Sequence, residues 1–253
     1  MRRVLVTGAS RGIGRAVATA FAERGDRVAV HYGHDRAAAE KTLRDLPGSG
    51  HAVVGGDIAD PEAARRIVDA AVAALGGIEV LVNNAALAPA ADNIHRVAEV
   101  EQARWQHIWQ HMLAINLLGP VHLTYAVAQH LIARDAPGHI VNIGSRGAFK
   151  GEPDFPAYGA SKAALQAFGQ SMAIALAPHG ISVTSVAPGF VDTERQTSKL
   201  TAPEGDSVRA QSPFGRVGTP AEVAAAVVYL ASSEATWASG AILDLNGASY
   251  LRT

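Results

Sequence analysis

The feature that most constrains the fold is a short apolar run at the start of the chain, followed by a glycine-rich turn and a helical pattern. Residues 3–7, Arg-Val-Leu-Val-Thr, are almost wholly apolar, which is typical of a strand covered on both faces. The turn spans residues 8–14, and the amphipathic pattern after it stops near Gly25. Because strands buried on both faces belong to parallel sheets, this order predicts an α/β fold with a parallel sheet.

Similar apolar runs alternate with helical patterns along the rest of the chain. They predict further strands at 26–31, 51–57, 78–83, 138–145, 180–186 and 241–245. This alternation predicts a doubly wound parallel sheet, of seven strands if the last run joins its edge, with helices on both faces. The length of 253 residues suits one domain of this type, and no internal repeat or linker divides it. We therefore expect a single domain, 1–253.

Composition excludes several classes of function. The net charge of -1 gives no reason to expect nucleic acid or an anionic membrane as partner. No apolar run is long enough to span a bilayer and the N-terminus is no signal peptide, so we expect a soluble, cytoplasmic protein. The absence of cysteine excludes disulfides and thiolate chemistry. His107 and His111 have metal-ligand spacing, but no third ligand is evident, and we predict no metal site.

A tyrosine and a lysine stand four residues apart, at Tyr158 and Lys162, in a segment with a good helical pattern. This spacing places both side chains on one helix face. A nearby cation lowers the pKa of a tyrosine from its usual value of about 10, and a three-unit shift requires roughly 4 kcal/mol. The pair can then exchange a proton near neutral pH. Ser145 ends a buried strand, where ligands bind in such sheets, and we expect its hydroxyl to hold a substrate oxygen.

Two further motifs accompany Ser145, Tyr158 and Lys162 in the sequence. Residues 7–14 read Thr-Gly-x-x-x-Gly-x-Gly, residues 83–86 read Asn-Asn-Ala-Ala, and Ser145 and 158–162 follow in order. With these motifs the chain resembles the short-chain dehydrogenase/reductase family over nearly its whole length. The resemblance implies a Rossmann-type catalytic domain that binds a dinucleotide and transfers hydride to or from a carbonyl or secondary alcohol. It implies the catalytic residues Asn116, Ser145, Tyr158 and Lys162.

The resemblance also implies where the nicotinamide dinucleotide lies. Glycines let the backbone approach a pyrophosphate, and the first helix turn offers free N–H groups to an anion. In relatives an aspartate contacts the adenine, and the turn after the sixth strand binds the nicotinamide. The expected cofactor-binding residues are Gly8, Ser10, Arg11, Gly12, Ile13, Gly14, Tyr32, His34, Asp57, Ile58, Asn84, Ala85, Tyr158, Lys162, Pro188, Gly189, Val191 and Thr193. Asn84 and Ala85 are expected near the adenine-side ribose.

The end of the second strand bears on the choice between NADP and NAD. Tyr32 stands where NAD-binding relatives place an acid, and Arg11 matches the residue that NADP-binding relatives use against the 2′-phosphate. Asp35 lies about where an NAD-binding acid is expected, but we place it past the strand as a helix N-cap. The sequence therefore favours NADP over NAD. Basic side chains that support this are His31, His34 and Arg36.

Several other positions and segments depart from the compact family pattern or have further implied roles. Ala86 replaces the glycine of Asn-Asn-Ala-Gly, which we expect to be tolerated. Residues 87–99 are elongated beside the expected pocket. Asn116 matches an asparagine that bends its helix and, in relatives, holds a water that relays protons, while Trp109 is interpreted as a packing residue. Residues 190–215 are polar and weakly patterned, and we expect a mobile substrate lid there.

The substrate remains open between two classes of enzyme, with a non-catalytic regulator as the rival from another class. A 3-oxoacyl thioester reductase, or another ketone reductase, would meet an acidic carrier protein with cations at its pocket mouth. The candidates for those cations are Arg146, Lys150, Lys199 and Arg209. An NAD-dependent sugar, polyol or secondary-alcohol dehydrogenase would want a polar pocket, which 87–99 can build. A homotetramer is expected by resemblance, with Tyr250 and Leu251 near its interface.

Overall fold

The computed structural model describes residues 1–194, 196–202 and 205–252, and its centre is a seven-stranded sheet. The strand order is β3-β2-β1-β4-β5-β6-β7, and every neighbouring pair is parallel. The doubly wound fold predicted from the apolar runs is confirmed. The strands are β1 (Arg3–Val6), β2 (Arg27–Tyr32), β3 (Ala52–Gly55), β4 (Val80–Asn83), β5 (Gly138–Ile143), β6 (Ile181–Pro188) and β7 (Ile242–Leu245).

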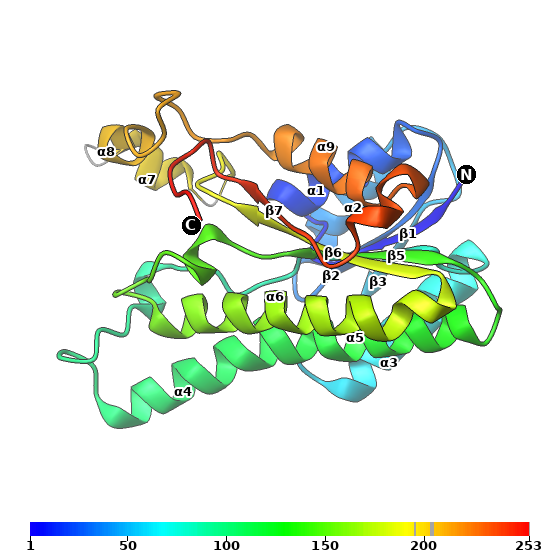
Figure 1. Cartoon of the computed structure of the whole chain (residues 1–253), viewed down its shortest axis with the longest axis horizontal. Helices are drawn as coiled ribbons and strands as arrows, with labels where there is room; N and C mark the ends of the chain where they lie inside the picture. The colour runs from blue at the N-terminus through cyan, green and yellow to red at the C-terminus, as the bar shows by residue number, and fades with distance from the viewer. Residues whose placement is uncertain (195, 203–204, 253) are drawn as a thin grey trace.

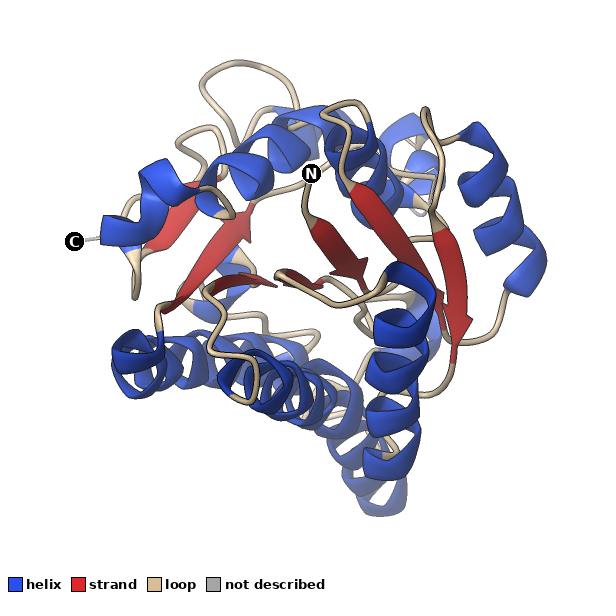
Figure 2. Cartoon of the chain, turned by 90° about the vertical axis from the view of Figure 1, so that its right-hand side faces the viewer, coloured by secondary structure: helices blue, strands red, loops and turns tan. Residues whose placement is uncertain are grey.

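Helices cover both faces of the sheet, as Figure 2 shows with the sheet between two helical layers. One layer contains α1 (Gly12–Ala22), α2 (Arg36–Asp45) and α9 (Pro220–Leu230). The other contains α3 (Pro61–Leu75), α5 (Gly119–Ile132) and α6 (Pro156–Leu176). Helix α4 (Gln102–Leu113) runs into α5 through a π-helical turn, η2 (Ala114–Leu118), so that the two form one long rod (Figure 1). Two short helices, α7 (Thr197–Thr201) and α8 (Gly205–Arg209), lie between β6 and α9.

Strand β1 shows why the first apolar run folds in the middle of the sheet. Val4 and Val6 pack in the core under α1, α2 and α9, while Leu5 between them packs in the core on the α3 and α5 side. All three are fully buried. Because successive strand residues point to opposite faces, a strand with helices on both sides must be apolar at every position.

The strand order reverses at β1, which lies between β2 and β4. The loops that follow the carboxyl ends of the strands gather at one end of the molecule, on the left of Figure 1. In open α/β sheets, ligands bind in the crevice beyond this switch point. The glycine turn after β1 and the Asn-Asn-Ala-Ala turn after β4 flank the crevice.

Side chains cap the starts of three helices, and the cap predicted at Asp35 is confirmed. Asp35 accepts a hydrogen bond from the backbone N–H of Ala38 at 2.9 Å, so it caps α2. Asp60 accepts one from Glu62 N at 3.0 Å and caps α3. Thr219 forms a capping box with Glu222 at the start of α9. One carboxylate oxygen of Asp35 is therefore engaged at the start of α2.

The described ranges contain no helix that is long and apolar enough to cross a membrane. Within the same ranges, no group of three or more His, Asp or Glu side chains is placed to hold a metal ion. The rings of His107 and His111 lie 6.0 Å apart on α4.

Candidate active site

Helix α6 presents Tyr158 and Lys162 at the carboxyl end of β5. Lys162 is 3 % exposed, and its amine donates a hydrogen bond to the carbonyl oxygen of Ile143 at 2.7 Å. Burial lowers the pKa of Lys162 to about 8, so the amine is still mostly an ammonium at pH 7. Tyr158 is half-buried and packs with a small apolar cluster that includes Trp109 and Met112. The interpretation of Trp109 as a packing residue is thus supported.

Ser145 lies two residues beyond the end of β5. Its hydroxyl oxygen accepts a hydrogen bond from the backbone N–H of Gly147 at 3.0 Å, which closes the turn η3 (Arg146–Ala148). Its carbonyl oxygen accepts a bond from Gln166 Nε2, on α6, at 3.4 Å. The loop of the serine and the helix of the tyrosine are therefore tied together.

Asn116 lies in the middle of η2, where the helix widens by one residue per turn. The expectation that it sits at a bend of this helix is consistent with that turn. Its side chain is fully buried and bonds both backbone groups of Leu87, accepting from N at 2.8 Å and donating to O at 3.0 Å. It also donates to Ser161 Oγ at 3.2 Å, and Ser161 donates to the carbonyl of Tyr158 at 2.8 Å. The water relay implied for Asn116 stays a prediction.

The glycine turn is held by Asn84, in a way that the sequence did not predict. The Asn84 amide donates to the carbonyl oxygens of Thr7 at 2.8 Å and Gly8 at 3.1 Å. A Cβ on Gly14 would lie 2.3 Å from Gly8 O and 2.5 Å from the Asn84 amide nitrogen, so no side chain fits there. The Asn84 amide therefore braces the turn, and the approach of Asn84 and Ala85 to the adenine-side ribose stays a prediction.

His31 does not supply the positive charge expected near the 2′-phosphate. It is 1 % exposed, and burial lowers its pKa to about 4, so it is not among the cations that favour NADP. Its Nδ1 accepts from the backbone N–H of Gly8 at 3.2 Å, which leaves Nε2–H to donate to Gly56 O at 3.0 Å. At neutral pH it is an uncharged brace between the turn after β1 and the turn after β3.

A carboxylate already occupies the anion-binding side of the glycine turn. Glu194 accepts a hydrogen bond from the backbone N–H of Gly12 at 3.1 Å and from the guanidinium of Arg15 at 3.0 Å. Thr193 stands beside it, since a Cβ on Gly12 would meet its methyl carbon at 3.4 Å. The amide at the start of α1 thus holds an anion in this structure, and the turn has the shape and donors that a dinucleotide phosphate requires.

The other predicted cofactor residues lie at the same edge of the sheet, at the ends of β1, β2, β3, β4 and β6. The ring of Tyr32 covers Gly55, because a Cβ there would meet Tyr32 Cζ at 2.5 Å. His34 and Arg11 are exposed, and Ile58 is buried. Asp57 is exposed and accepts from Ala59 N at 2.9 Å. The remaining members are Ser10, Ile13, Ala85, Pro188, Gly189 and Val191.

The loop after β6 is fixed by its backbone. Gly189 N donates to Leu245 O at 3.0 Å, and Val191 forms a parallel bridge with Gly218. The lid predicted at 190–215 contains α7 and α8, and its residues 195, 203 and 204 lie outside the described residues.

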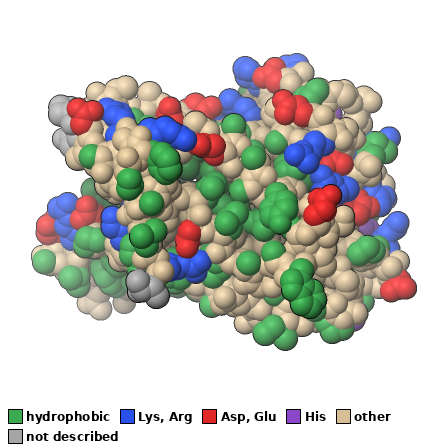
Figure 3. Space-filling model, turned by 45° about the horizontal axis from the view of Figure 1, so that its top comes forward, with side chains coloured by type: hydrophobic (Ala, Val, Ile, Leu, Met, Phe, Trp, Pro, Cys, Tyr) green, Lys and Arg blue, Asp and Glu red, His purple; other side chains and the backbone are tan. Residues whose placement is uncertain are grey.

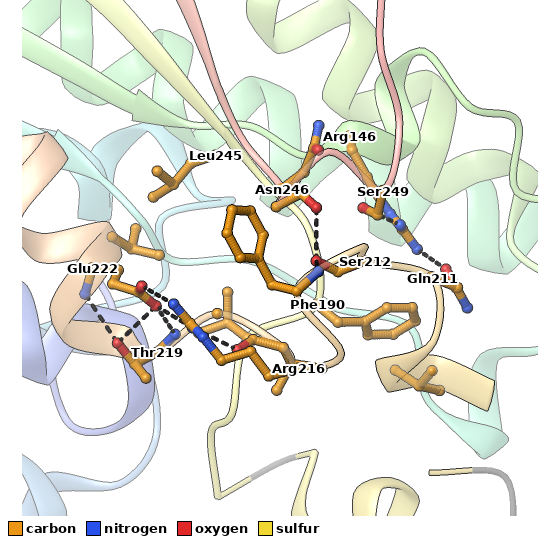
Figure 4. A pocket seen from close by; sticks show the side chains of 17 residues that line it. Arg146, Phe190, Gln211, Ser212, Arg216, Thr219, Glu222, Leu245, Asn246 and Ser249 are labelled. Carbon is orange, nitrogen blue, oxygen red and sulfur yellow. Dashed lines mark hydrogen bonds and ion pairs between the residues drawn. The ribbon is translucent and has the colours of Figure 1, made fainter. Parts of the chain in front are cut away.

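A cavity of about 220 Å³ lies between this loop, α8, the start of α9 and the end of β7. Figure 4 shows Arg146 at its wall, hydrogen-bonded to Ser249 Oγ at 2.6 Å and Gln211 Oε1 at 2.5 Å. The guanidinium also stacks on Phe190, 4.9 Å from the ring centroid. Burial lowers the pKa of Arg146, and Glu152 partly offsets this. Arg146 is therefore an internal clamp between the Ser145 loop, the predicted lid and the C-terminal segment.

Two of the four cations named as candidates for a basic pocket mouth are engaged within the molecule. Arg146 is 6 % exposed, and Arg209 forms an ion pair with Asp206 at 2.6 Å. Lys150 is exposed, and the side chain of Lys199 lies outside the part of the chain that the structure describes. On the face seen in Figure 3, cationic and anionic side chains are interspersed.

Comparison with known proteins places this arrangement in a family. A family model described as Enoyl-(Acyl carrier protein) reductase matches residues 8–247. The chain belongs to the short-chain dehydrogenase/reductase family. It is 34% identical over 253 residues to the L-rhamnose 1-dehydrogenase (NAD(P)(+)) of Sphingomonas sp. strain SKA58. That alignment covers 99% of this chain and 96% of the relative. The chain is also 34% identical over 247 residues to the 3-oxoacyl-(acyl-carrier-protein) reductase of Vibrio cholerae, covering 98% and 96%.

A solved structure of the short-chain dehydrogenase/reductase family extends the likeness to the whole fold. A short chain dehydrogenase from Burkholderia cenocepacia J2315, solved in complex with NADP, superposes with a TM-score of 0.86 at 30% identity, covering 98% of this chain and 97% of that one. The chain is therefore an oxidoreductase of this family that acts on alcohol or ketone groups. The family binds NAD(P), and the recognition made from the motifs is confirmed.

Proposed function

We propose that this short-chain dehydrogenase/reductase uses NADP(H) to interconvert a ketone and a secondary alcohol, with Tyr158 as proton donor and acceptor. The observation that carries the proposal is the buried ammonium of Lys162 on the tyrosine's own helix, bonded 2.7 Å from Ile143 O, two residues before Ser145. In that dry environment a neighbouring cation favours the phenolate strongly.

The proposed reaction divides among these side chains as follows. In reduction, a hydride adds to the carbonyl carbon while the Tyr158 phenol gives its proton to the carbonyl oxygen. The nicotinamide, when bound, supplies that hydride from C4 and becomes oxidised. The Ser145 hydroxyl holds the reacting oxygen, Lys162 stabilises the phenolate that remains, and Asn116 belongs to the path that returns a proton. Oxidation of the alcohol runs through the same groups in reverse.

We propose that the dinucleotide lies across the turn of residues 8–14, with Thr193 and the backbone near Val191 at its nicotinamide end. Exposed Arg11 and His34 remain as the groups for the 2′-phosphate, since Asp35 caps α2 and Arg36 pairs with Glu40 at 2.7 Å. NADP is therefore preferred over NAD in this proposal, with NAD as the alternative cofactor.

Replacing Glu194 by Gln is expected to tighten NADPH binding by about twofold to fivefold, the effect of removing an exposed ion pair. The carboxylate must leave Gly12 and Arg15 before a phosphate can take their donors, and the variant lacks that competing charge. Fluorescence titration measures the dissociation constant. Glu23→Gln, an exposed change on the same side of α1, is the matched control. Weaker binding in Glu194→Gln would mean that Glu194 supports the turn rather than competing with the cofactor.

The substrate class is tested by turnover in both directions. Purified protein with NADPH or NADH is assayed on an acetoacetyl thioester and a simple aromatic ketone, and with the oxidised cofactors on L-rhamnose and a secondary alcohol. The proposal expects turnover of a ketone or its alcohol. The burial of Arg146 and the pairing of Arg209 favour a small free substrate, such as a sugar or polyol, over a carrier-bound thioester. Cofactor binding without turnover across the panel would contradict the proposal.

A homotetramer, a mobile lid at 190–215 and a cytoplasmic location stay predictions. Exposed apolar side chains are consistent with subunit contacts on two faces: Tyr125 and Ile174 on α5 and α6, and Tyr229 on α9 with Trp237 nearby. Of the two C-terminal residues expected near an interface, Leu251 is exposed.

A further inference from the structure

The helix that carries the proposed catalytic pair has no cap of its own. The residue before α6, Phe155, has no side-chain oxygen, and Pro156 at the first helical position has no N–H. The first N–H that needs an acceptor belongs to Ala157, directly before Tyr158. An acceptor from elsewhere in the chain must therefore satisfy it, or a buried donor stays unpaired at the base of the tyrosine.

That acceptor is His95, from a segment 62 residues earlier, whose Nε2 receives the Ala157 N–H at 3.0 Å. The ring is fully buried and lies edge-on to Trp105 and Phe155, with centroids 5.6 Å and 6.4 Å away. Its Nδ1 lies 2.8 Å from the carbonyl oxygen of Asn93, so Nδ1–H donates there and the lone pair faces Ala157. The two bonds fix one neutral tautomer and one orientation of the ring.

The segment around His95 is itself held against the loop that leads into α6. The backbone N–H of His95 donates to Asp154 O at 3.0 Å, and Arg96 forms an ion pair with the Asp154 carboxylate at 2.7 Å. The Asn93 side chain closes the preceding turn by accepting from Ala90 N at 3.0 Å. The ring therefore cannot move without the loop before Tyr158.

The other end of the same segment reaches the tyrosine by a second route. The Asn116 side chain hydrogen-bonds both backbone groups of Leu87 and also donates to Ser161 Oγ. The Ser161 hydroxyl then donates to the carbonyl oxygen of Tyr158. The elongated region thus holds the tyrosine's turn of α6 from both sides. The sequence left the role of residues 87–99 open, with a polar pocket as one use of the segment; its contacts hold the first turns of α6.

We infer that His95 is a positioning residue for Tyr158, a neutral histidine that caps α6 and sets where the phenol lies; this rests on the proposed function. Nothing in the motif pattern of the sequence marks it. A reacting group displaced by about 1 Å loses about a hundredfold in rate. Loss of the acceptor frees the first turn of α6 and lets the phenol drift from the substrate oxygen, while the dinucleotide turn beyond β1 stays intact.

The test compares three substitutions at one position with a fourth as control. His95→Gln places an acceptor near the Nε2 position, whereas His95→Asn is too short to reach Ala157 and His95→Leu has none. We expect kcat to fall about tenfold to a hundredfold in the Asn and Leu variants and to recover to within about threefold in the Gln variant. NADPH affinity stays unchanged in all three. The control, His107→Leu, changes an exposed histidine on α4.

Amide hydrogen exchange at Ala157 gives a readout independent of turnover, and it should be faster in His95→Asn and unchanged in His95→Gln. If His95→Leu does not fold, the Asn and Gln pair carries the test. Equal kcat in wild type, Asn and Gln variants would overturn the inference, as would equal losses in Asn and Gln. Retained turnover in Tyr158→Phe would instead overturn the proposed function, so the two failures are distinguishable.

Discussion

Tyr158→Phe is expected to lower turnover by about a thousandfold or more while NADPH binds with near-normal affinity. The ring still packs against Trp109 and Met112, so the helix and its cluster are kept. The hydroxyl that we propose as the proton donor and acceptor is lost, and a positioned acid–base group is worth about 10² to 10⁴ in rate. Steady-state kinetics with the best substrate of the panel, together with fluorescence titration, separates the two effects.

The matched control for this variant is Tyr250→Phe. Tyr250 also donates its hydroxyl within the molecule, to Phe149 O at 3.1 Å, but it lies in the C-terminal segment and has no place in the proposed reaction. We expect turnover close to wild type there. A Tyr158→Phe enzyme that keeps more than about a tenth of wild-type turnover would contradict the assignment of the proton to Tyr158.

Acidification is expected to cost folding stability through His31. Its pKa is lowered from 6.5 to about 4 in the folded chain, so between these values the unfolded chain binds the extra proton and the folded one does not. The stability that neutral His31 contributes to the folded chain is fully present above about pH 6.5, and it is lost as the pH falls from there to about 4. Over the whole window it amounts to about 3 kcal/mol of the free energy of unfolding.

Urea unfolding of wild type and His31→Asn at about pH 7 and about pH 4.5 measures this contribution. Burial also lowers the pKa of His130 and His139, so only the difference between the two proteins isolates His31. Asparagine can still accept from Gly8 N but cannot take up the proton, and its stability should fall less on acidification. His34→Asn, at an exposed site, should follow wild type. An identical pH dependence in His31→Asn and wild type would contradict the claim that buried, neutral His31 stabilises the folded chain.

The sheet was predictable because each of its strands is apolar at consecutive positions. Val4, Leu5 and Val6 must all be apolar because helices lie on both faces of the sheet. Such a run can be recognised from these residues alone, without knowledge of the rest of the chain. The caps at Asp60 and Thr219 are equally local, since each side chain bonds a backbone group two or three residues on. The motif spacing then placed Ser145, Tyr158 and Lys162 at one edge of the sheet.

The contacts that sequence reasoning missed all join residues far apart in the chain. His31 bonds Gly8 across 23 residues, Glu194 reaches Gly12 across 182, and Arg146 joins Ser249 across 103. The neighbouring sequence of a histidine or arginine does not tell whether its side chain faces solvent or a buried carbonyl oxygen. Sequence reasoning therefore treats its positive charge as free to meet a ligand. Only the packed fold shows that burial makes His31 a neutral brace and Arg146 an internal clamp.

The proposed function requires a dinucleotide site that prefers NADPH, and a paired titration of the purified protein with NADPH and NADH at moderate salt tests this most directly. We predict that NADPH binds tighter by about tenfold, which is about 1.4 kcal/mol, through the exposed Arg11 and His34. Tighter binding of NADH would overturn the cofactor preference and make NAD, the alternative cofactor, the one that this site holds. Binding of neither would contradict the proposed function itself.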